Sequence, residues 1–387
     1  MATYYWVGGT GTWSGTGNTQ FAATSGGVAT LLNPTSADTV NFDANSGTAA
    51  TVTVTATAVS LSTTVNKADI NLSLSGSPTL CTTAGTLTLT LGTLTLNTFT
   101  LTIGKFASNN VNTRSIAFGT GNITLTGNAA LIVSMQNVVG FTYSGTPTVN
   151  ATYAGSTGTR SYTFGSQGAQ TESQALPINV TAGSDAFTFT NGSRLLTVNF
   201  TGYSGLATLG TGTFQLYGGL TLSSGMTIAS GGIAFSSTSA TPRTITTANK
   251  TLDFLFTMNG VGGTFAFQDA LTQGATRAFT ITNGTVQFKD GVTSTVGVFA
   301  TSSTTRKFLQ STLAGTQATL SQASGTVNAA YLDIQDINAT GGATWNAFTT
   351  SGNVDAGDNT GWNFGGTPDV DTEVGYRLRS FTQPRRF

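Results

Sequence analysis

The sequence of 387 residues has no histidine, a single cysteine and very little charge. Only 8% of its residues are Asp, Glu, Lys or Arg, and 15 acidic residues balance 15 basic ones. The missing histidine excludes a His-dependent triad, and the single cysteine excludes a typical zinc site and an internal disulfide framework. The balanced charge argues against a nucleic-acid-binding protein, which needs a basic surface. We therefore expect no cofactor, no bound metal and no nucleic-acid partner.

Long apolar runs are also missing from this chain. No stretch approaches the roughly 18 consecutive apolar residues of a membrane span. The start, MATYYWVGG, has neither the basic region nor the apolar region of a secretory signal. We expect a protein that is made in a cytoplasm and does not span a membrane. We expect Cys81 to pack as a small apolar side chain.

Threonine makes up roughly a fifth of the chain, and 49 residues are glycine. A disordered chain combines low hydrophobicity with high net charge, whereas 38% of these residues are hydrophobic and 24 are Phe. Disorder is therefore excluded. Thr, Gly and Asn all disfavour helix, so the composition predicts an all-β protein.

Alternating threonine and leucine define the stretch from Gly85 to Gly104, GTLTLTLGTLTLNTFTLTIG. Side chains two residues apart share one face of a strand, so the leucines face one side and the threonines face the other. The runs are separated only by Gly92 or by Asn97-Thr98, which is too little for hairpin loops. This pattern predicts short strands that coil and stack, each coil burying a narrow apolar column. We predict a single-stranded parallel β-helix, a solenoid with right-handed winding, over residues 46–365.

Stacking in register also accounts for the low charge. Identical positions of successive coils lie above one another, so Lys or Glu in a column would repel its neighbours. Thr and Asn can instead form ladders of hydrogen bonds between coils. We expect such ladders on the outside of the solenoid.

Tryptophans mark both ends of the predicted solenoid. Trp6 and Trp13 bracket a Gly-rich turn near the start, and Trp345 and Trp362 lie near the end. An uncovered solenoid end is a sheet edge that polymerises, and bulky side chains folded over the end coils would cover it. We predict an N-terminal cap over residues 1–45 and a last coil plugged by the two late tryptophans. An aromatic platform that binds sugar is the alternative for the N-terminal pair.

Six arginines share a local pattern, in which a small or turn residue precedes the arginine and an apolar residue follows two positions later. They are Arg114, Arg160, Arg194, Arg243, Arg277 and Arg306. Their spacing of about 29 to 49 residues corresponds to one or two coils. We predict that each lies at a corner leading into a strand and donates to carbonyls of neighbouring turns. A column of arginines that binds an anionic polysaccharide is the alternative.

Residues 366–387 break the pattern, because prolines interrupt them and acidic residues give way to four arginines. Such a tail is not expected to be ordered by itself. We predict a C-terminal docking arm that binds a sister chain or another protein. Its predicted docking residues are Tyr376, Arg377, Arg379, Phe381, Arg385, Arg386 and Phe387.

Three parts of the chain carry a family resemblance: the opening Trp6-Val-Gly-Gly-Thr-Gly-Thr-Trp13 with residues 34–43, the unit 112–127 and the closing segment 339–364. Together they resemble Thr/Gly-rich parallel β-helix structural proteins of tailed bacteriophages. The resemblance covers about residues 1–365. It implies a virion protein of the tail-fibre, spike or decoration type, often a homotrimer. Bacterial autotransporter passengers have a similar opening, but this chain lacks their signal peptide and C-terminal membrane barrel.

These observations lead to two main hypotheses of function. The first is a non-enzymatic virion structural protein, a rod anchored to other virion proteins by its C-terminal arm, with a homo-oligomer, favoured as a trimer, as its assembled state. The second is a receptor-binding or carbohydrate-binding spike that attaches to a host surface glycan. The spike would use groove-exposed aromatic rings at Tyr143, Tyr153, Tyr162, Tyr203 and Tyr217.

A third hypothesis, a polysaccharide depolymerase, requires two carboxylates that face one cleft. The close pairs late in the chain are Asp333 with Asp336 and Asp355 with Asp358. Both pairs lie in turn-rich segments, where Asp commonly bonds to the main chain. We therefore predict no catalytic residues. Calcium at Asp355 and Asp358 is the alternative for the second pair, although no EF-hand or nonapeptide repeat is present.

Overall fold

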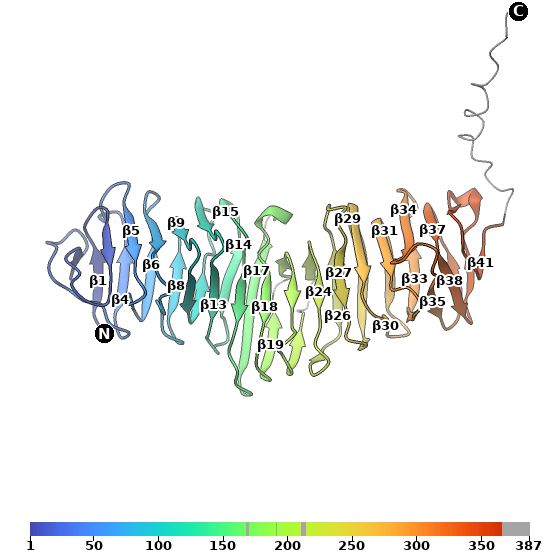
Figure 1. Ribbon diagram of the computed structural model, residues 1–387, viewed down its shortest axis with the longest axis horizontal. Coiled ribbons are helices and arrows are strands. Elements are labelled where there is room, and N and C mark those ends of the chain that lie inside the picture. The colour runs from blue at the N-terminus through green and yellow to red at the C-terminus, as the bar shows by residue number, and fades with distance from the viewer. Residues whose placement is uncertain (168–169, 191, 210–213, 366–387) are drawn as a thin grey trace, which may run out of the picture.

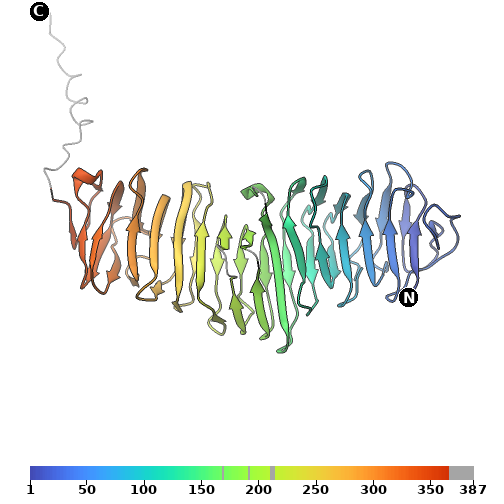
Figure 2. The same cartoon turned by 180° about the vertical axis from the view of Figure 1, so that it is seen from behind.

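The protein folds as a rod of short, stacked parallel strands. The computed structural model describes residues 1–167, 170–190, 192–209 and 214–365, and the chain winds through about 13 turns. Figures 1 and 2 show strands of successive turns side by side along the rod, with the first and last described residues at opposite ends. At about 4.8 Å per turn the rod is about 60 Å long. The predicted all-β, parallel solenoid is confirmed, and its right-handed winding stays a prediction.

Two sheets form faces of the N-terminal half, and, apart from antiparallel β3, each neighbour within a sheet comes from the next turn. The first sheet contains β1 (Thr3–Trp6), β4 (Thr39–Phe42), β6 (Ser62–Val65), β8 (Thr86–Leu89), β11 (Lys105–Ala107), β14 (Val133–Asn137), β17 (Thr159–Gln167), β19 (Ala186–Phe189), β22 (Leu206–Thr208), β25 (Thr227–Ile228) and, at its end, β3 (Phe21–Ala22). The second contains β2 (Gly11–Trp13), β5 (Thr51–Val54), β7 (Asn71–Leu74), β9 (Gly92–Thr95), β12 (Arg114–Ala117) and β15 (Phe141–Ser144).

A third and largest sheet continues to the C-terminal end of the rod. Its main path contains β10 (Thr100–Ile103), β13 (Asn122–Leu125), β16 (Val149–Ala151), β18 (Ile178–Val180), β21 (Val198–Asn199), β24 (Leu220–Thr221), β27 (Arg243–Thr246), β29 (Phe254–Phe267), β31 (Ala278–Phe288), β34 (Lys307–Ser311), β37 (Leu332–Gln335) and β40 (Val354–Asp355). A branch of it contains β20 (Arg194–Leu195), β23 (Phe214–Leu216), β26 (Gly231–Phe235) and β33 (Val298–Thr301).

Two small sheets complete the C-terminal half. The fourth sheet contains β28 (Thr251–Leu252), β30 (Thr272–Gln273), β32 (Thr293–Thr295), β35 (Ala318–Gln322) and β38 (Ile337–Gly341). The fifth contains β36 (Thr326–Asn328), β39 (Thr344–Asn346) and β41 (Trp362–Asn363). The described part of the chain adds two single-turn 3-10 helices, η1 (Glu172–Gln174) and η2 (Thr349–Ser351).

The Gly85–Gly104 stretch forms one complete coil, made of β8, β9 and β10. The chain turns between these strands at Gly92 and Asn97, both of which adopt the left-handed conformation, with φ of 86° and 58°. Glycine and asparagine reach this conformation most readily, which explains their places between the runs. The inward leucines of the three strands are fully buried, as the alternation predicts.

Phenylalanine fills the core of the C-terminal half. Phe256, Phe279 and Phe299 occupy the same register position on β29, β31 and β33. Their ring centroids lie 5.8 and 6.1 Å apart. Stacking in register places like residues above one another, so each aromatic ring packs on the ring of the next coil.

Neutral polar side chains form ladders on the outside, as predicted. Thr93 and Ser115, stacked on β9 and β12, have their hydroxyls 2.9 Å apart. The amide of Asn179 donates to Asn150 over 3.0 Å. These bonds follow the stacking direction and therefore hold coil to coil without placing like charges together.

The predicted arginine pattern does mark corners. Arg114, Arg194 and Arg243 begin strands, Arg160 is the second residue of β17, and Arg277 directly precedes β31. Arg306 likewise directly precedes β34.

Arg114 is the arginine whose hydrogen bonds match the prediction. It is 1% exposed and donates to the carbonyls of Ser108, Asn112, Asn137 and Val139 over 2.6–2.8 Å. Burial lowers the pKa of its guanidinium to about 10, so it stays charged at neutral pH.

Four other arginines pair with carboxylates instead of bonding mainly to carbonyls. The pairs are Arg160 with Asp185, Arg243 with Glu172, Arg277 with Asp253 and Arg306 with Asp333. Carbonyls are therefore not the main partners at these corners, because an acidic residue from another turn reaches each guanidinium. Arg160 also donates to the carbonyl of Ala182 over 3.2 Å, as expected.

Replacing Arg114 by alanine should destabilise the rod strongly. The substitution leaves four carbonyl groups without their hydrogen-bond donor. We expect the free energy of unfolding to fall by about 3 kcal/mol. Arg277→Ala is the matched control, because Arg277 is only partly buried and its partner Asp253 is exposed. Guanidinium denaturation should show a clearly lower midpoint for Arg114→Ala and little change for Arg277→Ala. Equal midpoints for the two variants would contradict the corner role of Arg114.

Candidate functional site

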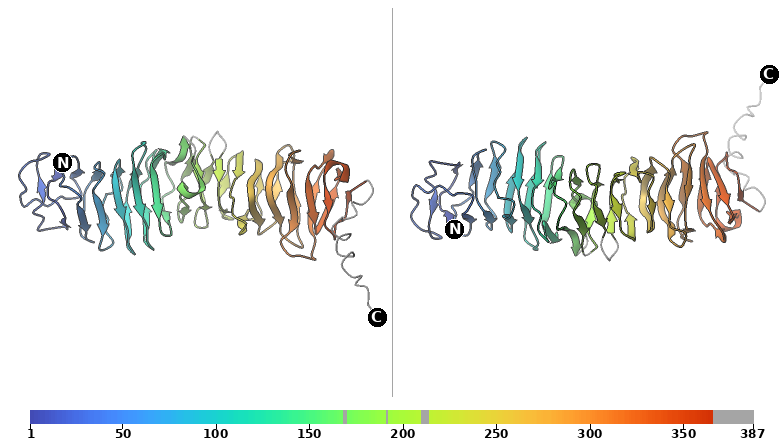
Figure 3. Two further views of the ribbon diagram at one scale, coloured as in Figure 1. Left: turned by 90° about the horizontal axis from the view of Figure 1, so that it is seen from above. Right: turned by 90° about the horizontal axis from the view of Figure 1, so that it is seen from below.

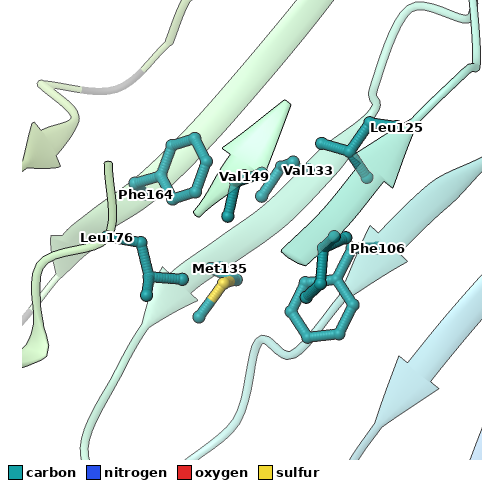
Figure 4. Close-up of a pocket in the computed structure, with 8 residues that line it drawn as sticks. Phe106, Leu125, Val133, Met135, Val149, Phe164 and Leu176 are labelled. Carbon is teal, nitrogen blue, oxygen red and sulfur yellow. The ribbon is translucent and has the colours of Figure 1, made fainter. Parts of the chain in front are cut away.

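The interior of the rod offers no space for a ligand at the cavity shown in Figure 4. This cavity of about 10 Å³ is surrounded entirely by apolar side chains. They are Phe106, Ile123, Leu125, Val133, Met135, Val149, Phe164 and Leu176. An apolar void of this size stays dry, so it is a packing defect and not a binding site.

Three of the four carboxylates considered as catalytic candidates have bonding partners within the rod. Asp333 pairs with Arg306, while Asp336 is buried and accepts from the main-chain N–H of Gly315 over 3.1 Å. Asp355 accepts from the side-chain amide of Asn359 over 2.7 Å. These bonds tie the acidic residues to turns and coils, as expected for Asp in such segments.

Metal-ligand clusters are absent from the described residues: no three His, Cys, Asp or Glu side chains converge there. Asp358 adopts a left-handed conformation with φ of 53°, and its main-chain carbonyl accepts from Gln317 over 2.7 Å. The pair Asp355 and Asp358 therefore serves a turn in this structure. Within the same residues, no helix has the length and apolarity needed to cross a bilayer.

A fully buried ion pair occupies the middle of the rod. The Nε and Nη2 atoms of Arg160 each lie 2.8 Å from a carboxylate oxygen of Asp185, and both side chains are completely buried. The guanidinium also lies over the rings of Tyr153, Phe187 and Tyr203, at 5.3–5.8 Å. The pair joins neighbouring turns, because its two residues lie 25 positions apart in the chain.

Most of the tyrosines predicted to be exposed are buried, which corrects that expectation. Tyr162, Tyr203 and Tyr217 lie in the core, and the hydroxyls of Tyr203 and Tyr217 donate to main-chain carbonyls. Desolvation raises the pKa of Tyr162 and Tyr203 above the usual range. Tyr143 and Tyr153 are half-buried, and their hydroxyls also donate to main-chain carbonyls. These rings do not form an aromatic platform for sugar.

A hollow lies on the outside of the third sheet. It consists of two adjoining depressions of about 490 and 280 Å³ that share Thr221. Its lining combines apolar surface with many hydroxyl and amide side chains and Arg243. They include Asn179, Thr197, Asn199, Thr201, Ser204, Ser223, Ser224 and Thr244.

The hollow coincides with a contraction of the turns. Register partners are 29 residues apart at Asn150 and Asn179, 20 apart at Ile178 and Val198, and 22 apart at Val198 and Leu220. The next turn, from Leu220 to Ile245, has 25 residues. The strands β20, β21, β24 and β25 have two residues each. A shorter turn encloses a smaller cross-section, so the surface recedes between longer neighbouring turns. The number of residues per turn is the sequence signal that could have located this hollow.

A segment around η1 crosses several turns beside the hollow. Glu172 accepts from Arg243 over 2.9 Å and from Ser237 over 2.9 Å, although the partners lie 71 and 65 residues further along the chain. Gln174 donates to the carbonyls of Val138 and Phe141 on the other side. Sequence reasoning missed this connection, because no local pattern links residues so far apart.

The predicted end-capping tryptophans lie inside the end coils. Trp6 on β1 and Trp13 on β2 are fully buried, whereas Trp345 on β39 is 3% exposed and Trp362 on β41 is half-buried. The predicted docking residues lie outside the described residues. They are Tyr376, Arg377, Arg379, Phe381, Arg385, Arg386 and Phe387.

No family model, curated protein or solved structure matches this chain. Inference about function therefore rests on the physical properties of the rod and on the resemblance carried by its sequence.

Cys81 should be inert in the folded protein. Burial raises the pKa of its thiol to about 11, so the reactive thiolate is scarce at neutral pH. At pH 8 a thiol reagent should modify folded Cys81 roughly a hundredfold more slowly than the same thiol in guanidinium. Asn66→Cys, which adds a thiol at an exposed position, should react at once and serves as the control. Rapid labelling of Cys81 would contradict the tight packing of this coil.

Proposed function

We propose that the protein is a non-enzymatic structural component of a bacteriophage particle, a fibre, spike or decoration rod anchored by residues 366–387. Its partners are other virion proteins and sister copies, with a trimer as the favoured assembly. The observation that carries this proposal is the use of the charged side chains: four arginines each pair with an acidic side chain from another turn of the rod. Such a surface suits assembly better than reaction.

The hydrophobic core supports the same proposal. It runs as one cluster from Trp6 near the first strand to Trp345 near the last. A continuous core transmits force along the rod without a hinge that depends on a ligand. Stiffness along one axis is the property that a particle appendage requires.

Deletion of residues 366–387 should give a folded rod that no longer attaches to particles. The core residues that the structure describes all lie before residue 366, so circular dichroism should stay close to that of the full chain. Occupancy on particles, measured by gel densitometry of purified virions, should fall at least tenfold. Arg277→Ala is a control for loss of a partly exposed arginine and should attach normally. Particles that retain the truncated rod at full occupancy would defeat the anchoring role.

Carbohydrate binding is the second candidate, and the hollow around Thr221 is the observation that favours it. Its hydroxyl, amide and guanidinium groups can donate and accept hydrogen bonds from a hydroxyl-rich ligand, and none of the buried tyrosines is needed. Within this candidate the ligand is a glycan that lies across β21, β24 and β27.

A glycan array tests this candidate with a matched pair of variants. Thr221→Lys places a long charged side chain in the hollow, and Thr124→Lys makes the same change on β13 of the same sheet, outside it. Glycan binding in the hollow predicts a loss of affinity of about tenfold or more for Thr221→Lys alone. Absence of any bound glycan, or equal losses in both variants, would reject the candidate.

A further inference from the structure

The two ends of the rod differ in how the sheets finish. At the N-terminal end β3 runs antiparallel to β1, pairing Trp6 with Phe21. The rings of these two residues meet edge to face at 5.1 Å, and both are completely buried. Antiparallel β3 therefore covers an edge that would otherwise be open. Figure 3 shows this segment at the opposite end from β41.

The C-terminal end has no such cover among the described residues. There β40 and β41 have a paired neighbour on one side only. The ring of Trp362 packs on Trp345 at 4.9 Å and on Phe299 at 6.3 Å, so it continues the core. Trp362 and Phe364 nevertheless remain half-buried. The last described aromatic residues of the core are therefore partly exposed to solvent.

Charge at this end is one-sided. No Lys or Arg occurs between Lys307 and Arg377 in the sequence. Asp355 and Asp358 are exposed in the last turn, whereas Asp333 is already paired with Arg306. The rim of the open end therefore carries negative charge without nearby cations in the last turn.

The residues that follow the last turn combine apolar and basic side chains, which complement the exposed rings and the carboxylates at this end. Within residues 374–381, VGYRLRSF, the apolar Val374, Tyr376 and Leu378 alternate with glycine or arginine. This period of two is the pattern of a strand with one apolar and one basic face. The 22 residues from 366 to 387 can span about 70 Å when extended, far more than the end of the rod requires.

We propose that residues 374–381 cover the C-terminal end of their own chain as an added strand along β41. The apolar face contacts Trp362 and Phe364, and Arg377 and Arg379 meet the carboxylates on the rim. The tether gives these residues a high effective concentration at the end where they begin, which favours their own chain over a second copy. This inference goes beyond the anchoring role and leaves residues 382–387 to that role.

Hydrogen exchange measured by mass spectrometry on the full chain tests the cover. Tyr376→Lys with Leu378→Lys should remove it, so amides of residues 354–364 should exchange at least tenfold faster while those of 39–65 do not change. The control, Arg385→Ala with Arg386→Ala, should leave exchange at 354–364 unchanged. Unchanged exchange at 354–364 in the lysine variant would overturn the proposal.

Charge reversal gives an independent test of the same contact. Asp355→Lys with Asp358→Lys should speed exchange at 354–364, and adding Arg377→Asp with Arg379→Asp should restore protection. Failure of the second pair to restore protection would contradict the predicted rim contacts. Protection that rises with protein concentration in the unmodified chain would identify a second copy as the cover and overturn the intramolecular proposal.

Particle attachment separates this proposal from the proposed function. A chain lacking residues 382–387 should lose attachment and keep protection at 354–364. If that chain loses attachment while the lysine variant shows no change in exchange, the result supports the anchoring role and contradicts the proposed cover by residues 374–381. If it keeps both attachment and protection at 354–364, the result supports the cover and contradicts an anchoring role for residues 382–387.

Discussion

The hydrogen-bonded stacking of one turn on the next governs the rest of this molecule. Strands pair with the strand one turn earlier and one turn later, so equivalent side chains form columns. A column tolerates Thr, Asn or Phe, which bond or pack with copies of themselves, but not repeated like charges. The low charge of the chain, the polar ladders outside and the phenylalanine stack inside follow from this one constraint.

Buried charged residues occur where the regular stacking of strands is interrupted. Arg114 fills a corner with donors to four carbonyls, and Arg160 with Asp185 neutralise each other within the core. Glu172 joins turns far apart in sequence beside the segment where turns contract. A buried guanidinium is retained only because partners satisfy its charge and most of its donors. The charges therefore stabilise the irregular parts of the rod, and the neutral ladders stabilise the regular parts.

The alternation of threonine and leucine was enough to predict the solenoid and the strands of the Gly85–Gly104 coil, and the turn residue before each arginine was enough to predict the arginine corners. These are local properties, set by residues two apart or by a turn residue beside a strand. The burial of Tyr162 and Tyr203 was not predictable, because the face of a residue depends on where each corner falls. The hollow at Thr221 and the pairing of Glu172 with Arg243 depend on turn length and on contacts 71 residues apart.

The register between β9 and β12 gives the most direct test of this account. Thr93 and Ser115 are stacked partners, and neighbouring strands place their Cα atoms about 4.8 Å apart, within reach of a disulfide. Mass spectrometry should find a disulfide in Thr93→Cys/Ser115→Cys under mild oxidation, and much less in Thr93→Cys/Ala117→Cys, which is two residues out of register. Equal crosslinking of both pairs, or none in the first, would contradict the stacked coils.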